Sequence, residues 1–418
     1  MKTIGMMCHR QCISVLFMVI AIQAWGRSVV FDDNVKTLQV VVNQEWLSPP
    51  VMQLGTSDVV NIGFDELSHT YHRYVYRLEH CEADWTPSAD IFESDWLEGF
   101  NDNPIETWEN SLNTTVLYTH YQLQIPNDRC RLKMSGNYRL HIFDEDNDNR
   151  EVLCAEFFVV EPLMNVRLGA TTNTDIDVNV SHQQVSMLVD YGGVNVTNVD
   201  EQLWTVVMQN GREDSRRVNP RPTNRRAGGL GWEHCRELIF DAGNEYRKYE
   251  VLDVSHATMG IEHIDWEAPF YHAYPFVSEP RRNYIYDEDA NGAFYIRNSD
   301  NIENDRTCDY VYVHYKLRPA KHYVNASIMV DGMWTTENAS LYVMDYDESD
   351  HSYNAAILQK QGYYSYQYVM VGSDGKTRFV PEEGSYYETE NTYQALVYYK
   401  GTTDRTWRLT GYQQVCLR

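Results

Sequence analysis

The chain has 418 residues, with 35 basic and 60 acidic side chains and a formal net charge of −25 at pH 7. This excess of negative charge argues against nucleic acids and anionic lipids as partners, because both favour basic surfaces. The length exceeds what one hydrophobic core usually serves, so we expect two to four domains.

The first 26 residues have the pattern of a secretory signal peptide. Lys2 and Arg10 form a short basic region, residues 13–22 are almost wholly apolar, and residues 24–26 are Ala-Trp-Gly, which offers the small residues that a signal peptidase reads. The apolar run is well short of the roughly 20 residues that a transmembrane helix needs. We therefore expect an exported mature chain that starts at residue 27 and has no membrane-spanning helix.

The rest of the chain alternates apolar and polar residues with period two. Examples are VKTLQVVVN (35–43), YRLHIFDED (138–146), YVYVHYKL (310–317) and YQALVYYKG (393–401). Such segments are rich in β-branched and aromatic residues, are bounded by turn residues and recur every 8–12 residues, which is typical of short antiparallel strands. The predicted fold class is all-β, with tandem β-sandwich domains of the immunoglobulin-like type.

Two breaks in this rhythm predict the domain boundaries. FFVVEP (157–162) reads as a last strand that closes at a proline, and AYPFVSEPRRN (273–283) interrupts the alternation with two prolines. The predicted units are residues 27–162, 163–277 and 278–418.

Six cysteines remain after the leader, at wide spacings that match no zinc motif. An exported protein can form disulfides, but six cysteines allow 15 pairings and the sequence does not choose among them. Buried free thiols therefore remain an equal alternative. The residues are Cys81, Cys130, Cys154, Cys235, Cys308 and Cys416.

Three local motifs are favoured as plain loops. DEDNDN (144–149) has acids at the first, third and fifth positions of a calcium loop, but lacks its glycine and its final glutamate. The GKT within residues 372–377 lacks the first glycine of a phosphate-binding loop. Residues 211–226 carry six arginines and two prolines and form the one local basic patch, which we interpret mainly as a solvated hairpin loop.

Residues 80–102 combine seven acidic residues with Trp85, Trp96 and Phe100 and contain no Lys or Arg. A glycosidase needs two carboxyl groups at a defined separation, and nothing here marks such a pair. His80 and Glu82 could share one face of a strand as a weak metal pair, which is less than half a site. A binding surface is therefore favoured over catalysis.

The same segment resembles the plug protein family of the type IX secretion system. The likeness begins with HCEADWTPS (80–88) and GFNDN (99–103) and continues with NTTVLYTHY (113–121) and SGNY (135–138). It extends in order to YETEN (387–391) and departs most in the arginine-rich segment.

This resemblance implies a periplasmic, non-enzymatic β-sandwich protein without a cofactor, metal or catalytic residue. Its partner would be the giant outer-membrane translocon β-barrel, whose periplasmic mouth it would occlude when no substrate is exported. Whether the aromatic residues of 80–102 face the barrel or the domain interior stays open. The predicted partner-binding residues are Asp84, Trp85, Trp96, Phe100 and Asn101.

The alternative is a secreted carbohydrate-binding β-sandwich protein or a glycan-active enzyme. Its main support is the content of 31 tyrosines, because aromatic rings stack on sugars. The same residues suit broad protein interfaces and strand positions in general. An outer-membrane barrel is disfavoured, because the strands are short and charges fall on both of their faces.

Overall fold

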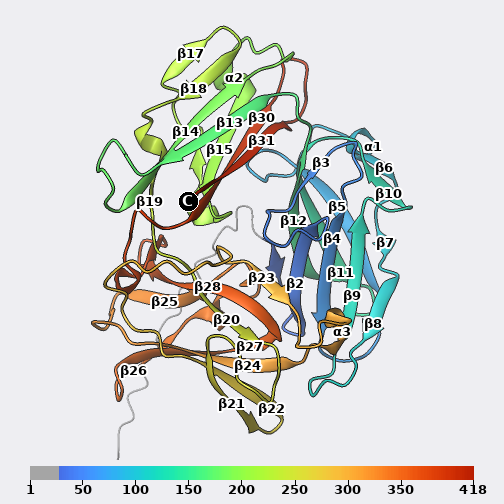
Figure 1. Ribbon diagram of the computed structural model, residues 1–418. Helices are drawn as coiled ribbons and strands as arrows, with labels where there is room; N and C mark the ends of the chain where they lie inside the picture. Colours follow the sequence, from blue (N-terminus) through green and yellow to red (C-terminus); the bar gives the residue numbers. More distant parts are fainter. Residues whose placement is uncertain (1–27) are drawn as a thin grey trace, which may run out of the picture.

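The computed structural model describes residues 28–418 (Figure 1). The predicted signal peptide, residues 1–26, lies outside these residues. Antiparallel strands dominate and helices are short, so the all-β prediction is confirmed. Among residues 28–418, no helix has the length and apolar character to cross a membrane.

The first unit is a sandwich of two sheets. Its strands are β1 (Val29–Val30), β2 (Val35–Val42), β3 (Val51–Gln53), β4 (Val60–Glu66), β5 (Tyr74–Cys81), β6 (Leu97–Gly99), β7 (Asn103–Pro104), β8 (Thr107–Asn110), β9 (Thr119–Ile125), β10 (Cys130–Leu132), β11 (Gly136–Asp144) and β12 (Arg150–Val160). One sheet has the order β1-β12-β11-β5-β7, with β3 also on β12, and the other has the order β2-β4-β9-β8. β10 and β6 form a small separate pair.

Strand β11 shows how the alternating sequence produces this sandwich. Tyr138, Leu140 and Ile142 are fully buried in the core of the first unit. Arg139 and His141 lie between them on the opposite face, because successive side chains of a strand point to opposite sides of the sheet. The outer face of this sheet therefore carries polar residues.

The second unit is completed by the C-terminal end of the chain. Its strands are β13 (Asn165–Thr171), β14 (His182–Asp190), β15 (Leu203–Gln209), β16 (Arg217–Val218), β17 (Asn224–Arg226), β18 (Gly229–Trp232), β19 (Ile239–Asp241), β30 (Asn391–Tyr399) and β31 (Arg408–Leu417). One sheet has the order β13-β14-β18-β17, with β19 on β14, and the other has the order β16-β15-β30-β31. In Figure 1 the red strands β30 and β31 lie among the green strands of this unit.

The third unit lies between these two parts of the second in the sequence. Its strands are β20 (Arg247–Val251), β21 (Ile261–Glu267), β22 (Phe270–Pro275), β23 (Phe294–Ile296), β24 (Tyr310–Leu317), β25 (Ala326–Asp331), β26 (Asp345–Asp347), β27 (Ser352–Lys360), β28 (Gly362–Gly372) and β29 (Thr377–Phe379). β28 pairs with β20, β23, β25 and β29, and the second sheet has the order β21-β22-β24-β27-β26.

This strand pairing differs from a division of the chain into three consecutive units. The break at residues 273–283 begins in the last residues of β22 and continues into the connection that follows, so it lies inside the third unit and is not the boundary expected at 277/278. β30 pairs with β15 from Leu203↔Tyr399 to Gln209↔Tyr393. Alternation reveals that a segment is a strand but not which distant strand it joins. Pairing with a distant strand is possible because the entropic cost of closing a loop rises only slowly with its length.

Short helical turns connect the strands. They are α1 (Glu93–Trp96), α2 (Val199–Gln202), α3 (Asn304–Thr307), η1 (Glu213–Ser215), η2 (Arg236–Leu238), η3 (Ala339–Tyr342) and η4 (Pro381–Glu383).

The cysteines outside the leader and two of the sequence motifs have simple structural roles. The six cysteines are free thiols, five of them buried. DEDNDN connects β11 to β12 as a hairpin, and the segment with GKT connects β28 to β29 in the same way. Tyr364, Tyr366 and Tyr368 of β28 are buried in the core of the third unit, so part of the tyrosine content fills the interior.

Candidate functional site

The acidic aromatic segment follows β5 at one end of the first unit. His80 is buried and contacts Ser88 Oγ at 2.8 Å and the Ser135 carbonyl oxygen at 3.2 Å. Glu82 accepts hydrogen bonds from the Thr406 hydroxyl and the Trp407 N–H of the second unit. The two side chains therefore serve different contacts within the molecule.

Asp84 and Trp85 form a turn that is held within the molecule. Asp84 accepts hydrogen bonds from the backbone N–H and the hydroxyl of Thr86 at 3.1 and 2.6 Å. Trp85 adopts a φ of 67° and is only 3% exposed. Its ring packs edge-on against Phe158 and under the guanidinium of Arg139, so intramolecular contacts occupy it.

Of the other three predicted residues, two make contacts within the molecule and one is exposed. Trp96 is 6% exposed and packs against Tyr138 in the core. Asn101 bridges the backbone N–H and carbonyl of Leu78, which ties the segment to β5. Phe100 is 77% exposed, so it is the aromatic residue among the five predicted ones that faces solvent. The binding role of the five residues stays a prediction.

The junction between the first and second units is mainly apolar. A cluster of buried side chains from both units fills it, and we call it the apolar junction: Ala83, Val160, Val206, Met208, Leu396, Tyr398 and Leu409. Tyr398 also donates a hydrogen bond to Asn137 at 2.7 Å. Burial of these surfaces stabilises the contact in proportion to the apolar area removed from water.

The junction between the first and third units is built on buried charge. Asp65 of β4 and Lys360 of β27 are each 1% exposed, and their Oδ2 and Nζ atoms lie 2.6 Å apart. Tyr310 donates to the same carboxylate at 2.7 Å, and His120 Nδ1 lies 2.7 Å from its other oxygen. Burial alone would raise the pKa of Asp65, but Lys360 and His120 hold it below its usual value. We call this group the charged junction.

A second carboxylate strengthens the same contact. Asp309 accepts hydrogen bonds from the backbone N–H groups of Thr115 and Val116 at 2.6 and 2.9 Å. Tyr118 donates to the Cys308 carbonyl at 2.8 Å. Sequence reasoning did not select these pairs, because each joins segments that are far apart in the chain. Thr115, Val116 and Tyr118 lie in the motif NTTVLYTHY (113–121), but the motif does not indicate their partners.

The arginine-rich segment differs only in part from the solvated hairpin loop that we expected. Arg221, Arg225 and Arg226 are exposed, as expected. The side chains of Arg212 and Arg216 are only 13% and 11% exposed. Arg212 lies 4.6 Å from the ring centre of Phe379 in the third unit, and Arg216 pairs with Glu213 at 3.0 Å. Burial raises the pKa of Glu213 to about 8, although Arg216 acts in the opposite direction. Neighbouring acids and aromatic rings make this burial of arginine possible.

Two small hollows, of about 300 and 370 Å³, lie over the outer face of the first unit's β11-containing sheet. Among residues 28–418, two groups of three side chains could hold a metal ion: His141 with Glu151 and Cys154, and His72 with Asp144 and Asp146. In the second group, Asp144 and Asp146 already accept hydrogen bonds from the N–H groups of Asp146 and Arg73, respectively.

Comparisons with known proteins identify the family. Residues 35–161 match the model of the type 9 secretion system plug protein, first domain. The chain is also similar to a crystal structure of a hypothetical protein from Parabacteroides merdae ATCC 43184, with 35% identity, a TM-score of 0.91 and coverage of 94% of this chain and 100% of that one. No curated protein matches. The chain therefore belongs to the type 9 secretion system plug protein family.

Proposed function

We propose that the protein binds the periplasmic mouth of the giant outer-membrane translocon barrel and occludes its pore when no substrate is exported. Family membership gives it a plug role in type 9 secretion and an association with that secretion system. The barrel partner, the gating of its pore and the absence of catalysis are our proposals. A very wide barrel has a lumen that its own side chains do not fill, so a separate body is needed to close it.

The observation that carries this proposal is the way the three units lock together. The first unit contacts the second through the apolar junction and the third through the charged junction. Arg212 joins the second unit to the third through Phe379. In Figure 1 the first unit, in blue and cyan, lies beside both others. A body whose three units all contact one another resists hinge motion. A stopper requires this rigidity.

We base the proposed contact surface for the barrel on the aromatic rings that the acidic aromatic segment exposes. Phe100 and Phe92 are 77% and 72% exposed, close to the ends of α1 and β6. Exposed aromatic rings commonly anchor protein interfaces, and a standing complex is expected to bury more than about 2,000 Å². We propose that these two rings contact the barrel and that Asp84 and Asn101 hold the segment in shape.

The experiment is a pull-down from detergent-solubilised envelopes of the native host, with a tagged full chain as bait. We expect mass spectrometry to recover an outer-membrane protein of very high mass. Deletion of the gene should make the envelope leakier to small dyes. An envelope that stays tight, together with a bait that recovers polysaccharide and no translocon, would refute the proposal.

A paired variant tests the surface itself. Phe92→Asp with Phe100→Asp should abolish recovery of the translocon, because charges would replace the two proposed anchors. Ile285→Asp is the matched control, since Ile285 is also 77% exposed but lies in the third unit. Equal recovery by the paired variant and the control would place the interface elsewhere.

One observation favours the carbohydrate-binding alternative. The outer face of the sheet that contains β21, β22 and β24 carries stacked rings, with His263, Tyr274 and His314 at successive centroid distances of 4.4 Å. Binding of polysaccharide that is lost in Tyr274→Ala, with translocon recovery unchanged, would assign a glycan to this face.

A further inference from the structure

Three kinds of metal-ligating side chain meet on the outer face of the β11-containing sheet in the first unit. His141 belongs to β11, and Glu151 and Cys154 belong to β12. His141 and Cys154 are direct partners across the two strands, so their side chains emerge on the same face.

A β-bulge brings Glu151 to that face. The pairing runs from His141↔Cys154 and Ile142↔Leu153 to Phe143↔Glu151, so Val152 is the additional residue. Val152 and Leu153 are both fully buried in the core. Glu151, the residue before the bulge, is thereby shifted in phase, so its side chain points outward on the same face as Cys154. Bulges of this kind re-aim side chains and occur next to functional sites.

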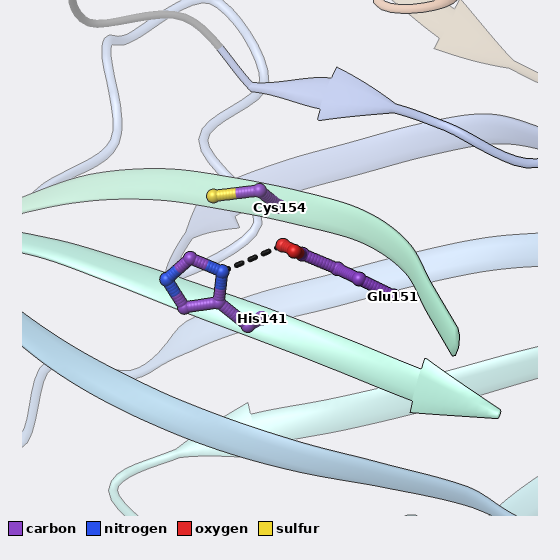
Figure 2. A group of neighbouring side chains, drawn as sticks. All are labelled: His141, Glu151 and Cys154. Carbon is purple, nitrogen blue, oxygen red and sulfur yellow. Dashed lines mark hydrogen bonds and ion pairs between the residues drawn. The ribbon is translucent and has the colours of Figure 1, made fainter. Parts of the chain in front are cut away.

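The ligand atoms lie close enough to share one ion. His141 Nδ1 is 2.6 Å from Glu151 Oε1, and a ring nitrogen of His141, a carboxylate oxygen of Glu151 and the Sγ of Cys154 all lie within 4.8 Å of one another. Figure 2 shows the imidazole and the carboxylate in contact, with the Cys154 sulfur on the neighbouring strand above the ring.

A fourth residue orients the imidazole. Glu79 of β5 lies 3.5 Å from His141 Nε2, the nitrogen turned away from Glu151. Metal-binding histidines typically donate their second ring N–H to a carboxylate, which fixes the tautomer and the ring plane.

The group has a closed side and an open side. Cys154 is buried, whereas the His141 and Glu151 side chains are 20% and 34% exposed. His141, Glu151 and Glu79 line a hollow of about 370 Å³. An ion held by the three ligands would therefore have a free coordination position that faces this hollow.

We propose that His141, Glu151 and Cys154 form a binding site for Zn²⁺ or a similar divalent transition metal. Thiolate and imidazole ligands select borderline-soft cations over Ca²⁺ and Mg²⁺, which prefer oxygen. Three protein ligands with one open position are the usual number at exchangeable or reactive zinc centres. The site is independent of the proposed plug function, because its ligands lie outside the proposed barrel contact.

The test is titration of the chain without residues 1–26, in a Cys416→Ser background that removes the exposed thiol. We expect one equivalent of Co²⁺ to give a thiolate-to-cobalt charge-transfer band, which Zn²⁺ then displaces. Cys154→Ser should abolish the band. Glu79→Gln should weaken Zn²⁺ affinity about 10–100-fold, and His141→Gln should weaken it more.

His72→Gln is the matched control, because His72 belongs to the other metal-capable group of the described residues. It should leave Zn²⁺ affinity unchanged. Cys154→Ala, which removes the ligand without burying a new polar group, verifies by circular dichroism that loss of the band does not reflect unfolding. The proposal is overturned if the parent shows no band, if the band survives in folded Cys154→Ser, or if His72→Gln loses as much affinity as His141→Gln.

Discussion

The two junctions of the first unit stabilise the molecule by different means. The apolar junction contacts the second unit through aliphatic side chains and one tyrosine. The charged junction contacts the third unit through Asp65 and Lys360, supported by Tyr310 and His120. Apolar contact is non-directional and tolerates small displacements, whereas a buried ion pair is favourable only when its hydrogen bonds are complete. We infer that the apolar junction supplies affinity between units and the charged junction fixes their relative orientation.

The largest expected effect is at the charged junction. Lys360→Met would leave the Asp65 carboxylate buried without its cation, and we expect the free energy of unfolding to fall by about 3–5 kcal/mol. Urea denaturation measures the loss. The double variant Asp65→Asn with Lys360→Met should recover most of it, because the charge is then removed altogether. A loss below about 1 kcal/mol in the single variant would show that the pair does not define this junction.

A slightly smaller effect is expected at the apolar junction. Leu409→Ala should destabilise the chain by about 2–4 kcal/mol, because the side chain is fully buried and its removal leaves a cavity. Hydrogen exchange should accelerate around Leu409 and Val160 but not around Lys360. Val218→Ala, at an exposed position of the second unit, is the control and should change stability by less than about 0.5 kcal/mol. Faster exchange at both junctions would show that they are coupled.

A pH-dependent change in the free energy of unfolding is expected from Glu213, which lies close to the contact between the first and second units. Burial raises its pKa to about 8 from a usual value of 4.5. The folded chain therefore retains a proton that the unfolded chain has released, so this contribution is complete below pH 4.5 and is lost as the pH rises through about 8. Glu213→Gln should be more stable than the parent by about 1–2 kcal/mol at pH 9 and equal to it at pH 4.

Urea midpoints measured from pH 4 to pH 9 test this expectation. Glu237→Gln is a suitable control, because Glu237 lies at η2 in the same unit and accepts a hydrogen bond from the Arg221 backbone N–H. A constant difference between Glu213→Gln and the parent across this range would contradict the assignment.

The smallest effect on stability is expected at the exposed ring. Phe100→Asp should change the free energy of unfolding by less than about 0.5 kcal/mol, because the side chain is 77% exposed. The same variant should reduce recovery of the translocon in the pull-down. A large loss of stability would mean that Phe100 serves the fold, as Trp85 and Trp96 do.

The contrast between Trp85 and Phe100 shows how far the sequence leads at this segment. Both rings lie among acidic residues in one loop, and composition does not indicate which of them contacts a partner. Trp85 is buried because its turn, with a positive φ, directs the ring toward Phe158 and Arg139. Those contacts lie on β11 and β12, and no local pattern in residues 80–102 indicates them.

The sequence by itself determined the all-β class, the positions of many strands and the family, because alternation and turn residues are local and the motifs are contiguous. Only the tertiary structure decided that β30 and β31 return to the second unit and that Arg212 is buried. It also decided that a bulge aligns Glu151 with His141, and that Asp65 meets Lys360 from 295 residues away. Each of these depends on long-range pairing and on the phase of a strand, since one additional residue moves a side chain to the other face of its sheet.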